Sequence, residues 1–594
     1  MNFEIALLLI LILATVANFL FEVLAVEIFA LSLMGSLILL GILSPEQAFL
    51  GFSNPAVIMI AGAMIMTGSI IHNGAADLIA RKLQTLAGRS QNRLILILLS
   101  TVTLMSSFIN NVAATAMFIP VVEGISKRKG QNPRRFLLPI AFTSMLGGVC
   151  TLIGTSTNVA VSGALGAYGL EPIGMFELTP IGILIAVAGV GYLFVISRFF
   201  ISVTPSSGRV DDYGMREYLF EILVQEGSPI SGSTLAESDL SERFHLNVLG
   251  VVRGGQRFLS PPGSMSILAG DLLLVQGELR SAIAGPLPPG LEVKTDPRFR
   301  DKDLESDQVK VVEATVSYNS PFVGASLKEL NFRQRYELNV LAIYRREEPV
   351  VEKVGKILIQ AGDVLLIQGR EESFRRLWQD PSWLLLEDVV LPKYRPDRFL
   401  RALLIFGGAV VLGSLQVTSI PVAFLIGAVL TIIFRCFTFE EAERYLNLRL
   451  ILIVAAMLSM SMAMEVSGTA SFLAQATVLA FQAHGPLVLL AGFFLLTVLL
   501  TQPMSNSAAA LLVVPIGIHA ARLISVDPRT FVVAIVVAAS CSFLTPLEPA
   551  CMLVFGTGKY RYTDFLKYGL GLTMLVFLIT LWAVPKIWPF VPAV

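Results

Sequence analysis

The sequence predicts a polytopic α-helical membrane protein made of two inverted repeats, with two small soluble α+β domains inserted between them. The chain of 594 residues is 54% hydrophobic and only 15% charged, whereas soluble domains carry about 25% charge. Residues 201–396 depart from this pattern, with charges, prolines and short alternating runs. Polar breaks at 106–114 and 501–508 separate apolar runs that are shorter than the roughly 20 residues a spanning helix needs.

Residues 1–200 are predicted to form the first membrane repeat. Three spans are expected first, and the earliest of them should be retained, because Met1–Glu4 lacks the basic start of a signal peptide. These spans lie near residues 5–22, 25–43 and 55–73. Runs 94–105 and 113–122 then flank the first polar break, which predicts a re-entrant hairpin with a site at membrane depth. The repeat ends with a crossing broken within the motif Gly154–Asn158 and a span near 178–200.

Basic residues set the predicted orientation. They lie before and after the first hairpin, at Arg81, Lys82, Arg89, Arg93, Lys127, Arg128, Lys129, Arg134 and Arg135. Residues 44–54 and 168–173 contain no Lys or Arg. Since positive loops stay in the cytoplasm, we expect a multi-pass protein of the plasma (inner) membrane, with the lipid bilayer around its spans. Its soluble domains should be cytoplasmic and both termini outside.

An internal repeat divides the inserted region into domains 201–300 and 301–396. The segment Arg243–Arg253 matches the segment that starts at Arg335, and Ala269–Gly277 matches the segment that starts at Ala361, both at a spacing of 92 residues. The "AGD.LL.QG" pattern of the latter pair resembles the TrkA-C domain, the C-terminal regulatory subdomain of potassium-conductance regulators (also called the RCK C-terminal domain). The resemblance leaves two roles open, a sensor of an unknown small ligand or a dimerisation and spacer module.

Residues 397–594 repeat the order of the first half. Their predicted elements are spans near 398–415, 420–436 and 449–465, hairpin arms at 486–500 and 509–518, a broken crossing and a last span near 565–588. Asn111 matches Asn506, and Pro120 matches Pro515, both at a spacing of 395 residues; Glu46 matches Glu440 at 394. Because each half has five crossings, an odd number, the second repeat must be inverted relative to the first.

The two polar breaks are where we expect the chemistry. Amides at a half-helix N-terminus suit an anion, and opposing carbonyl ends with Ser, Thr and Asn oxygens suit a hard cation such as Na⁺. The formal net charge of zero gives no sign of nucleic-acid binding. The four cysteines lie in apolar stretches without metal or disulfide spacing. No catalytic set or phosphate loop stands at useful spacing, so an enzyme is not expected.

Three motifs are similar to those of the divalent anion:sodium symporter (DASS) family of the ion-transporter superfamily. They are Ile109–Ala113 continuing to Pro120, Gly154–Asn158, and Ser505–Ser507 continuing to Pro515. With its two central TrkA-C-like domains, the chain resembles the sulfate-type members. This resemblance implies a scaffold and a moving transport domain, usually in a homodimer, that work by an elevator motion. It implies no cofactor, with Na⁺ as the coupling ion.

Residue by residue, the resemblance implies one substrate site and two sodium sites. The substrate site would consist of Asn110, Asn111, Val112, Thr155, Ser505, Asn506 and Ser507. The first sodium site would use Ser106, Asn110, Asn111 and a carbonyl oxygen near Gly154. The second would use Thr501, Asn506 and carbonyl oxygens near Met504 and Thr545.

Two residues depart from the family pattern. Val112 lacks the hydroxyl that helps to hold the substrate anion, although its amide remains. Glu548 places a carboxylate at membrane depth, where such a group is costly and by default functional, so it is a candidate coupling residue. A structural pair with Lys559, or a backbone contact, is the alternative.

These observations predict sodium-coupled symport of a small divalent anion, with sulfate first. A proton-linked sodium antiporter, or another anion or metalloid transporter of the same superfamily regulated through the TrkA-C-like domains, is the alternative. A channel or sensor gated by those domains is a third.

Overall fold

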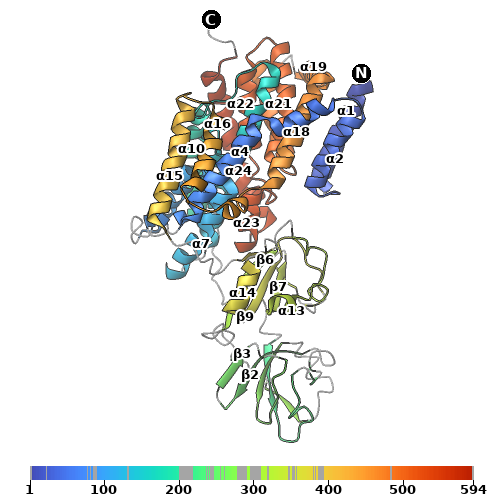
Figure 1. Ribbon diagram of the computed structural model, residues 1–594, viewed down its shortest axis with the longest axis vertical. Helices are drawn as coiled ribbons and strands as arrows, with labels where there is room; N and C mark the ends of the chain where they lie inside the picture. The colour runs from blue at the N-terminus through green and yellow to red at the C-terminus, as the bar shows by residue number, and fades with distance from the viewer. Residues whose placement is uncertain are drawn as a thin grey trace. The chain divides into compact units, whose positions relative to one another are not determined.

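The computed structural model divides into two compact units. The helical unit consists of Met1–Ser202 with Val390–Val594, and the β unit of Val203–Val389 (Figure 1). The described residues are 3–21, 23–76, 78–79, 82–83, 90–129, 133–199, 219–235, 237–238, 240, 246–254, 256–259, 261, 263–276, 290–294, 309–316, 320–345, 348–350, 355, 357–378, 380, 383–385, 394–481, 485–558 and 560–590.

The helical unit contains two series of helices in matching order. The first is α1 Phe3–Phe21, α2 Val26–Leu39, α3 Pro45–Ser53, α4 Pro55–His72, α6 Gln91–Ser106, α7 Asn111–Lys129, α8 Arg134–Gly148, α9 Ser156–Ala164, the 3₁₀ helix η1 Leu165–Tyr168, and α10 Thr179–Phe199. The second is α15 Pro396–Ser414, α16 Ile420–Ile433, α17 Phe439–Glu443, α18 Leu448–Val466, α19 Thr469–Phe481, α20 Pro486–Thr501, α21 Asn506–Leu523, α22 Pro528–Ala539, α23 Pro549–Thr557 and α24 Tyr562–Ile587.

The packing of the two series follows their repeat relation. Helix α2 packs on α18, and its counterpart α16 packs on α4. In the same way, α9 packs on α21, and its counterpart α23 packs on α7. Six helical segments within the described ranges are long and apolar enough to cross a membrane. The chain is therefore a multi-pass membrane protein with repeated halves.

A short helix that hydropathy alone did not predict begins at the same place in each half. Ser44 accepts from the amide of Gln47, whose side chain accepts from the amide of Ser44, and this capping box starts α3. Thr438 and Glu441, which lie 394 residues later, make the same capping box at the start of α17. A reciprocal cap of this kind pairs two amide donors that a helix start leaves free. The Glu46–Glu440 sequence match thus marks an equivalent pair of helix starts.

The helix that directly follows each polar break is longer than its apolar run. Helices α7 and α21 have 19 and 18 residues and continue through Pro120 and Pro515. Hydropathy underestimated α7 because its last turns carry Glu123 and basic residues, which end the apolar run without ending the helix. Helix α21 is long enough to span by itself, whereas α6 and α20 have 16 residues each. A re-entrant path for these pairs remains a prediction.

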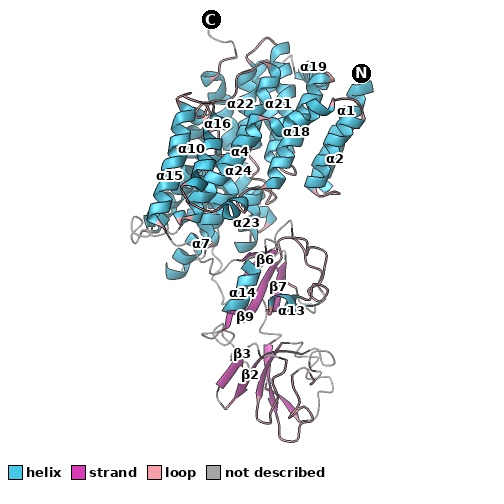
Figure 2. Cartoon of the chain, viewed as in Figure 1, coloured by secondary structure: helices cyan, strands magenta, loops and turns pink. Residues whose placement is uncertain are grey.

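The β unit contains two sheets (Figure 2). Both sheets are antiparallel and have the same strand order. One has the order β3-β2-β4-β1-β5 and the other β8-β7-β9-β6-β10. The strands are β1 Leu219–Val224, β2 Asn247–Arg253, β3 Gln256–Leu259, β4 Leu272–Gln276, β5 Leu291–Lys294, β6 Val309–Val316, β7 Asn339–Arg345, β8 Glu348–Pro349, β9 Val364–Arg370 and β10 Trp383–Leu385. The second sheet also carries the short helices α13 Phe332–Tyr336 and α14 Glu371–Trp378. The 92-residue repeat read from the sequence is confirmed.

The aspartate of each repeated Gly-Asp pair is buried and forms an ion pair with a partly exposed arginine of the neighbouring strand. Arg253 binds Asp271 through Nε and Nη2 at 2.8 and 2.7 Å, and Arg345 binds Asp363 at the same distances. Both carboxylates are 1% exposed. Each also accepts an amide hydrogen at 2.8 Å, from Leu268 and Gln360 respectively. The motif is thus explained as a bidentate pair with its lone pairs satisfied.

Equivalent leucines of the two sheets share one buried cluster. Leu249 and Leu341, and likewise Leu274 and Leu366, are 92 residues apart, and all four are buried in it. Each sheet also has a separate core of its own. Because neighbouring residues of a strand point to opposite faces, each sheet buries one face in its own core and the other in the shared cluster. This packing joins the two copies into one compact unit, and their identity as TrkA-C domains stays a prediction.

Candidate functional site

Within the first polar break, residues 107–110 separate α6 from α7. Ser106 Oγ donates to Asn111 Oδ1 at 3.0 Å, and both side chains are buried. Asn110 Oδ1 accepts from the amide of Val112 at 2.9 Å, so Asn110 caps α7 with its side chain. The structure therefore brings Ser106 and Asn111 into contact, whereas the Asn110 side chain binds the amide of Val112 at the helix start.

Within the second polar break, residues 502–505 separate α20 from α21. This break repeats the arrangement of the first with one more hydrogen-bond partner. Thr501 Oγ1 donates to Asn506 Oδ1 at 2.6 Å, which is the counterpart of the Ser106–Asn111 bond at a spacing of 395 residues. Ser542 Oγ also donates to Asn506 Oδ1 at 2.6 Å. Ser505 is the N-cap of α21 but makes no side-chain cap bond. Both asparagines are buried in helix starts that contain no charged residue.

The first crossover loop, residues 149–155, packs tightly against the first break. The Thr151 hydroxyl donates to the carbonyl of Ser107. A Cβ on Gly148 would lie 2.5 Å from Asn111 Oδ1, and a Cβ on Gly154 would lie 2.5 Å from the Gly148 carbonyl oxygen. A side chain at either position would clash, so Asn111 and Gly154 both pack closely against Gly148. The role of the Gly154 carbonyl in a sodium site stays a prediction.

The second crossover loop, residues 540–548, is held to the second break by Gln502. Its Nε2 donates to the carbonyl of Cys541 at 3.1 Å, and its Oε1 accepts from the amide of Leu544 at 3.2 Å. Thr545 Oγ1 donates to the carbonyl of Gln502 at 3.4 Å. Thr545 therefore lies beside this break, and Met504, inside the break, is buried.

Hydroxyl groups connect the second break to the first crossover. Ser507 Oγ lies 3.3 Å from Ser156 Oγ and 3.3 Å from Thr157 Oγ1. Thr155, which caps α9 through its hydroxyl, immediately precedes these two residues. The predicted substrate residues Thr155 and Ser507 are thus brought close together across the two halves.

Val112 and Glu548 are placed differently from the other predicted residues. Val112 has no polar side-chain atom, and its amide binds Asn110. Within the ranges that the structure describes, the Glu548 side chain makes no hydrogen bond to Asn111 or Asn506. The Glu548 side chain is half-buried and has no ion pair among the described residues. Lys559, its suggested partner, lies outside them. Glu548 therefore stays a candidate without an assigned contact.

Several residues of the site escaped the sequence analysis as functional groups. They are Gly148, Thr151, Ser156, Thr157, Asn158, Gln502 and Ser542. Ser156, Thr157 and Asn158 lie inside a motif that was recognised, so the signal was present. Ser542 carries no such signal, because it lies 36 residues from Asn506 in the chain.

The chemistry of the two breaks fits a hard monovalent cation. Their side-chain ligands are neutral oxygens from serine, threonine and asparagine. No group of three or more His, Cys, Asp or Glu that could hold a metal occurs in the described part of the chain. Hard cations prefer oxygen ligands, and with no fixed charge an anion could share the site.

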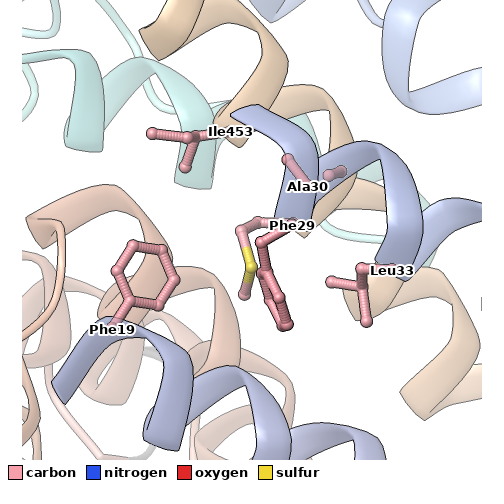
Figure 3. Close-up of a pocket in the computed structure, with 7 residues that line it drawn as sticks. Phe19, Phe29, Ala30, Leu33 and Ile453 are labelled. Carbon is pink, nitrogen blue, oxygen red and sulfur yellow. The ribbon is translucent and has the colours of Figure 1, made fainter. Parts of the chain in front are cut away.

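A small apolar pocket elsewhere in the helical unit is separate from this site. It lies between α1, α2 and α18 (Figure 3). Its lining consists of Phe19, Phe29, Ala30, Leu33, Ile453, Ala456 and Met457. None of these residues was predicted to bind an ion or a substrate, and none offers a polar side-chain group to one.

Comparison with known proteins shows that the chain is similar to transporters. The model of a family described as citrate transporter (CitMHS) matches residues 16–539. An uncharacterized transporter of Synechocystis is 31% identical over 98% of this chain and 96% of its own. A putative sulfur deprivation response regulator of Chlamydomonas reinhardtii is 29% identical over 92% and 95%. Sodium/sulfate cotransporter 2 of the same alga is 26% identical over 61% of this chain and 42% of its own.

Proposed function

The chain belongs to the citrate transporter (CitMHS) family, and from this premise we propose that it couples Na⁺ to the symport of a small divalent anion, with sulfate as first candidate. One observation carries the proposal. The Ser106–Asn111 and Thr501–Asn506 hydrogen bonds occupy equivalent positions of the two repeats. Two equivalent interruptions of apolar helices at matching places mark the substrate site of many secondary transporters.

Each break would bind one sodium ion. Ser106, Asn111 and a carbonyl near Gly154 would form the first site, with Asn110 at its edge. Thr501, Asn506 and carbonyls near Met504 and Thr545 would form the second. Asn111 Oδ1 has two lone pairs and accepts from one hydroxyl, so it can keep this donor and still bind an ion. Asn506 Oδ1 already accepts from Thr501 and Ser542, so an ion at the second site would replace one of these two donors. This reading needs no fixed charge and explains why both breaks are neutral.

The anion would lie between the two breaks. The N-termini of α7 and α21 start at Asn111 and Asn506 and carry partial positive charge. Hydroxyl donors come from Ser507 and from Thr155 in the first crossover. A bound Na⁺ beside each helix start would add positive potential, so anion and cation binding would support each other.

The finer parts of the proposal concern the motion and the assembly. We propose that α6–α9 and α20–α23 move as a transport domain against α2–α4 and α15–α18, in an elevator motion within a homodimer. The packing of α9 on α21 and of α23 on α7 supports the first group as one body. Re-entrant hairpins, DASS membership, a plasma-membrane location and cytoplasmic TrkA-C-like domains that bind a small ligand belong to the same proposal.

The substrate assignment draws on the named relatives. Relatives are named sodium/sulfate cotransporters, and the matching family model is described as a citrate transporter. Sulfate and citrate are both anions with several oxygens, so hydroxyls and helix N-termini suit either one. We place sulfate first, because a putative sulfur deprivation response regulator matches nearly the whole chain.

Thermal unfolding of the purified protein with sulfate, citrate, succinate or arsenite, each with and without Na⁺, tests the proposal. A ligand that binds the folded state at 100 times its Kd stabilises it by about 2.7 kcal/mol. We expect sulfate to raise the unfolding temperature only when Na⁺ is present, with K⁺ at equal ionic strength as control. Sulfate stabilisation that is equal in Na⁺ and K⁺ would exclude sodium coupling.

A proton-linked sodium antiporter is the second candidate function. It is favoured by the half-buried carboxylate of Glu548, which has no ion pair in the described ranges. In the same experiment, this function would appear as a Na⁺ effect without any anion effect. That Na⁺ effect would change with pH, and Glu548→Gln would remove its pH dependence.

A further inference from the structure

The Asn158 side chain combines two satisfied donors with an acceptor that has no partner. Its Nδ2 donates to the carbonyl of Thr151 at 2.8 Å and to that of Gly148 at 3.1 Å. The side chain is fully buried, and its Oδ1 has no hydrogen-bond partner in the described part of the protein. Two carbonyl acceptors on the nitrogen fix which end of the amide is which.

A buried acceptor without a partner is rare in folded proteins. Leaving it unpaired costs free energy, so such an atom usually marks a bound water, an ion or a functional constraint. Asn158 Oδ1 is therefore a buried acceptor that no donor from the described part of the chain satisfies.

The position of Asn158 connects this oxygen to the first break. Its partner Gly148 also approaches Asn111 Oδ1 so closely that an added Cβ would lie 2.5 Å away. Gly154, whose carbonyl was predicted for the first sodium site, packs against the Gly148 carbonyl. Asn158 thus orients the backbone of the crossover loop that faces Asn111.

An amide side chain beside the second crossover loop has its oxygen satisfied. Gln502 holds the second crossover loop in the same way, with Nε2 on the carbonyls of Val498 and Cys541. Its Oε1, however, accepts from the amide of Leu544 at 3.2 Å. Both amide side chains hold a crossover loop, but Gln502 corresponds to Ser107 and not to Asn158 at the 395-residue spacing, and its oxygen has a donor.

We propose that Asn158 Oδ1 is an additional oxygen ligand of the first sodium site, beside Ser106 and Asn111. This inference rests on the proposed function, because it assumes that the first break binds Na⁺. The cation would supply the missing partner of the orphaned oxygen. Na⁺ is chemically suited to this role, since neutral carbonyl-type oxygens are ligands of hard cations.

Two substitutions separate binding of the ion from support of the loop. Asn158→Ala removes both the donors and the free oxygen. Asn158→Asp keeps oxygens at this position but loses the donors to Gly148 and Thr151. If the oxygen binds Na⁺, Asp should retain more Na⁺ affinity than Ala; if the residue only supports the loop, the two variants should be equally impaired.

The readout is the NaCl concentration that gives half of the maximal thermal stabilisation, measured for Na⁺ and Li⁺ on the purified full-length protein. We expect Asn158→Ala to raise it about tenfold or more for Na⁺, as for the loss of other ligand-shell groups, and to change the Li⁺/Na⁺ ratio. Asn158→Asp should stay closer to wild type. Asn54→Ala is the matched control, because Asn54 also donates to a carbonyl, that of Gly163 at 3.0 Å, but its Oδ1 is satisfied by the amide of Ala56.

The outcomes distinguish this inference from the function on which it rests. A wild-type Na⁺ response with Ala and Asp equally impaired, or with Ala unchanged, would overturn the role of Asn158 alone. A wild-type protein that does not respond to Na⁺ would overturn both the inference and the proposed sodium coupling.

Discussion

The two breaks are built alike but are satisfied to different degrees. In each, a hydroxyl at the end of one helix donates to the asparagine that starts the next, Ser106 to Asn111 and Thr501 to Asn506. Asn506 has a second donor, Ser542 at 2.6 Å, and no described hydroxyl does the same for Asn111. The second break is therefore held mainly by the protein, whereas the first has acceptor capacity left for a ligand.

The repeat relation thus gives the two breaks the same asparagine and hydroxyl positions, whereas single residue differences between the halves give the two asparagines different numbers of hydrogen-bond donors. Val112 stands where the second half has Ser507, so hydroxyls collect on the side of Ser507, Ser156 and Thr157. The two halves are thus not interchangeable, and we expect ligands to depend on them unequally. The following predictions test how far the equivalence extends.

The largest effect is expected from removing the shared asparagines. Asn111→Ala or Asn506→Ala should reduce Na⁺-dependent anion transport in vesicles to background, because even outer-shell groups of bound metals contribute about 10- to 100-fold in affinity. Thr477→Ala, which loses only a hydroxyl bonded within α19, is the folding control. Near-normal transport in either asparagine variant would mean that the two breaks do not act together.

An intermediate effect is expected from adding a methyl group at Gly148, which packs closely against Asn111 in the first break. In Gly148→Ala the new methyl would lie 2.5 Å from Asn111 Oδ1 and displace it. We expect about tenfold weaker Na⁺ stabilisation in thermal unfolding. Gly124→Ala in α7 is the control, because nothing lies within 4 Å of its added Cβ. Equal behaviour of the two alanine variants would place Asn111 outside the ion site.

The smallest effect is expected from the additional donor of the second break. Ser542→Ala removes one of two hydroxyls on Asn506 and should lower the free energy of unfolding by about 1 kcal/mol, the usual worth of a buried hydrogen bond. Ser540→Ala is the matched control in the same loop, since its hydroxyl donates only to Val536 at 3.4 Å. If Ser542→Ala instead abolished Na⁺ binding, Ser542 would be an ion ligand and the second break would not be held by the protein alone.

The sequence by itself determined the class of the protein and its repeats. Low charge and long apolar runs indicated a membrane protein, because a bilayer requires apolar spans of a defined length. The constant spacings of 92 and about 394–395 residues indicated two kinds of internal repeat, and they matched equivalent strands, caps and helix starts. The asparagines at the breaks were also found, because polar residues between short apolar runs stand out locally.

Only the tertiary structure decided which groups meet. The Ser507–Ser156 contact joins residues 351 positions apart, and Ser542 reaches Asn506 across 36. Hydropathy and spacing describe the chain along its own length, so they cannot show which loop packs on which break. The orphaned oxygen of Asn158 is of the same kind, since an unpaired acceptor becomes visible only when every neighbour has been placed.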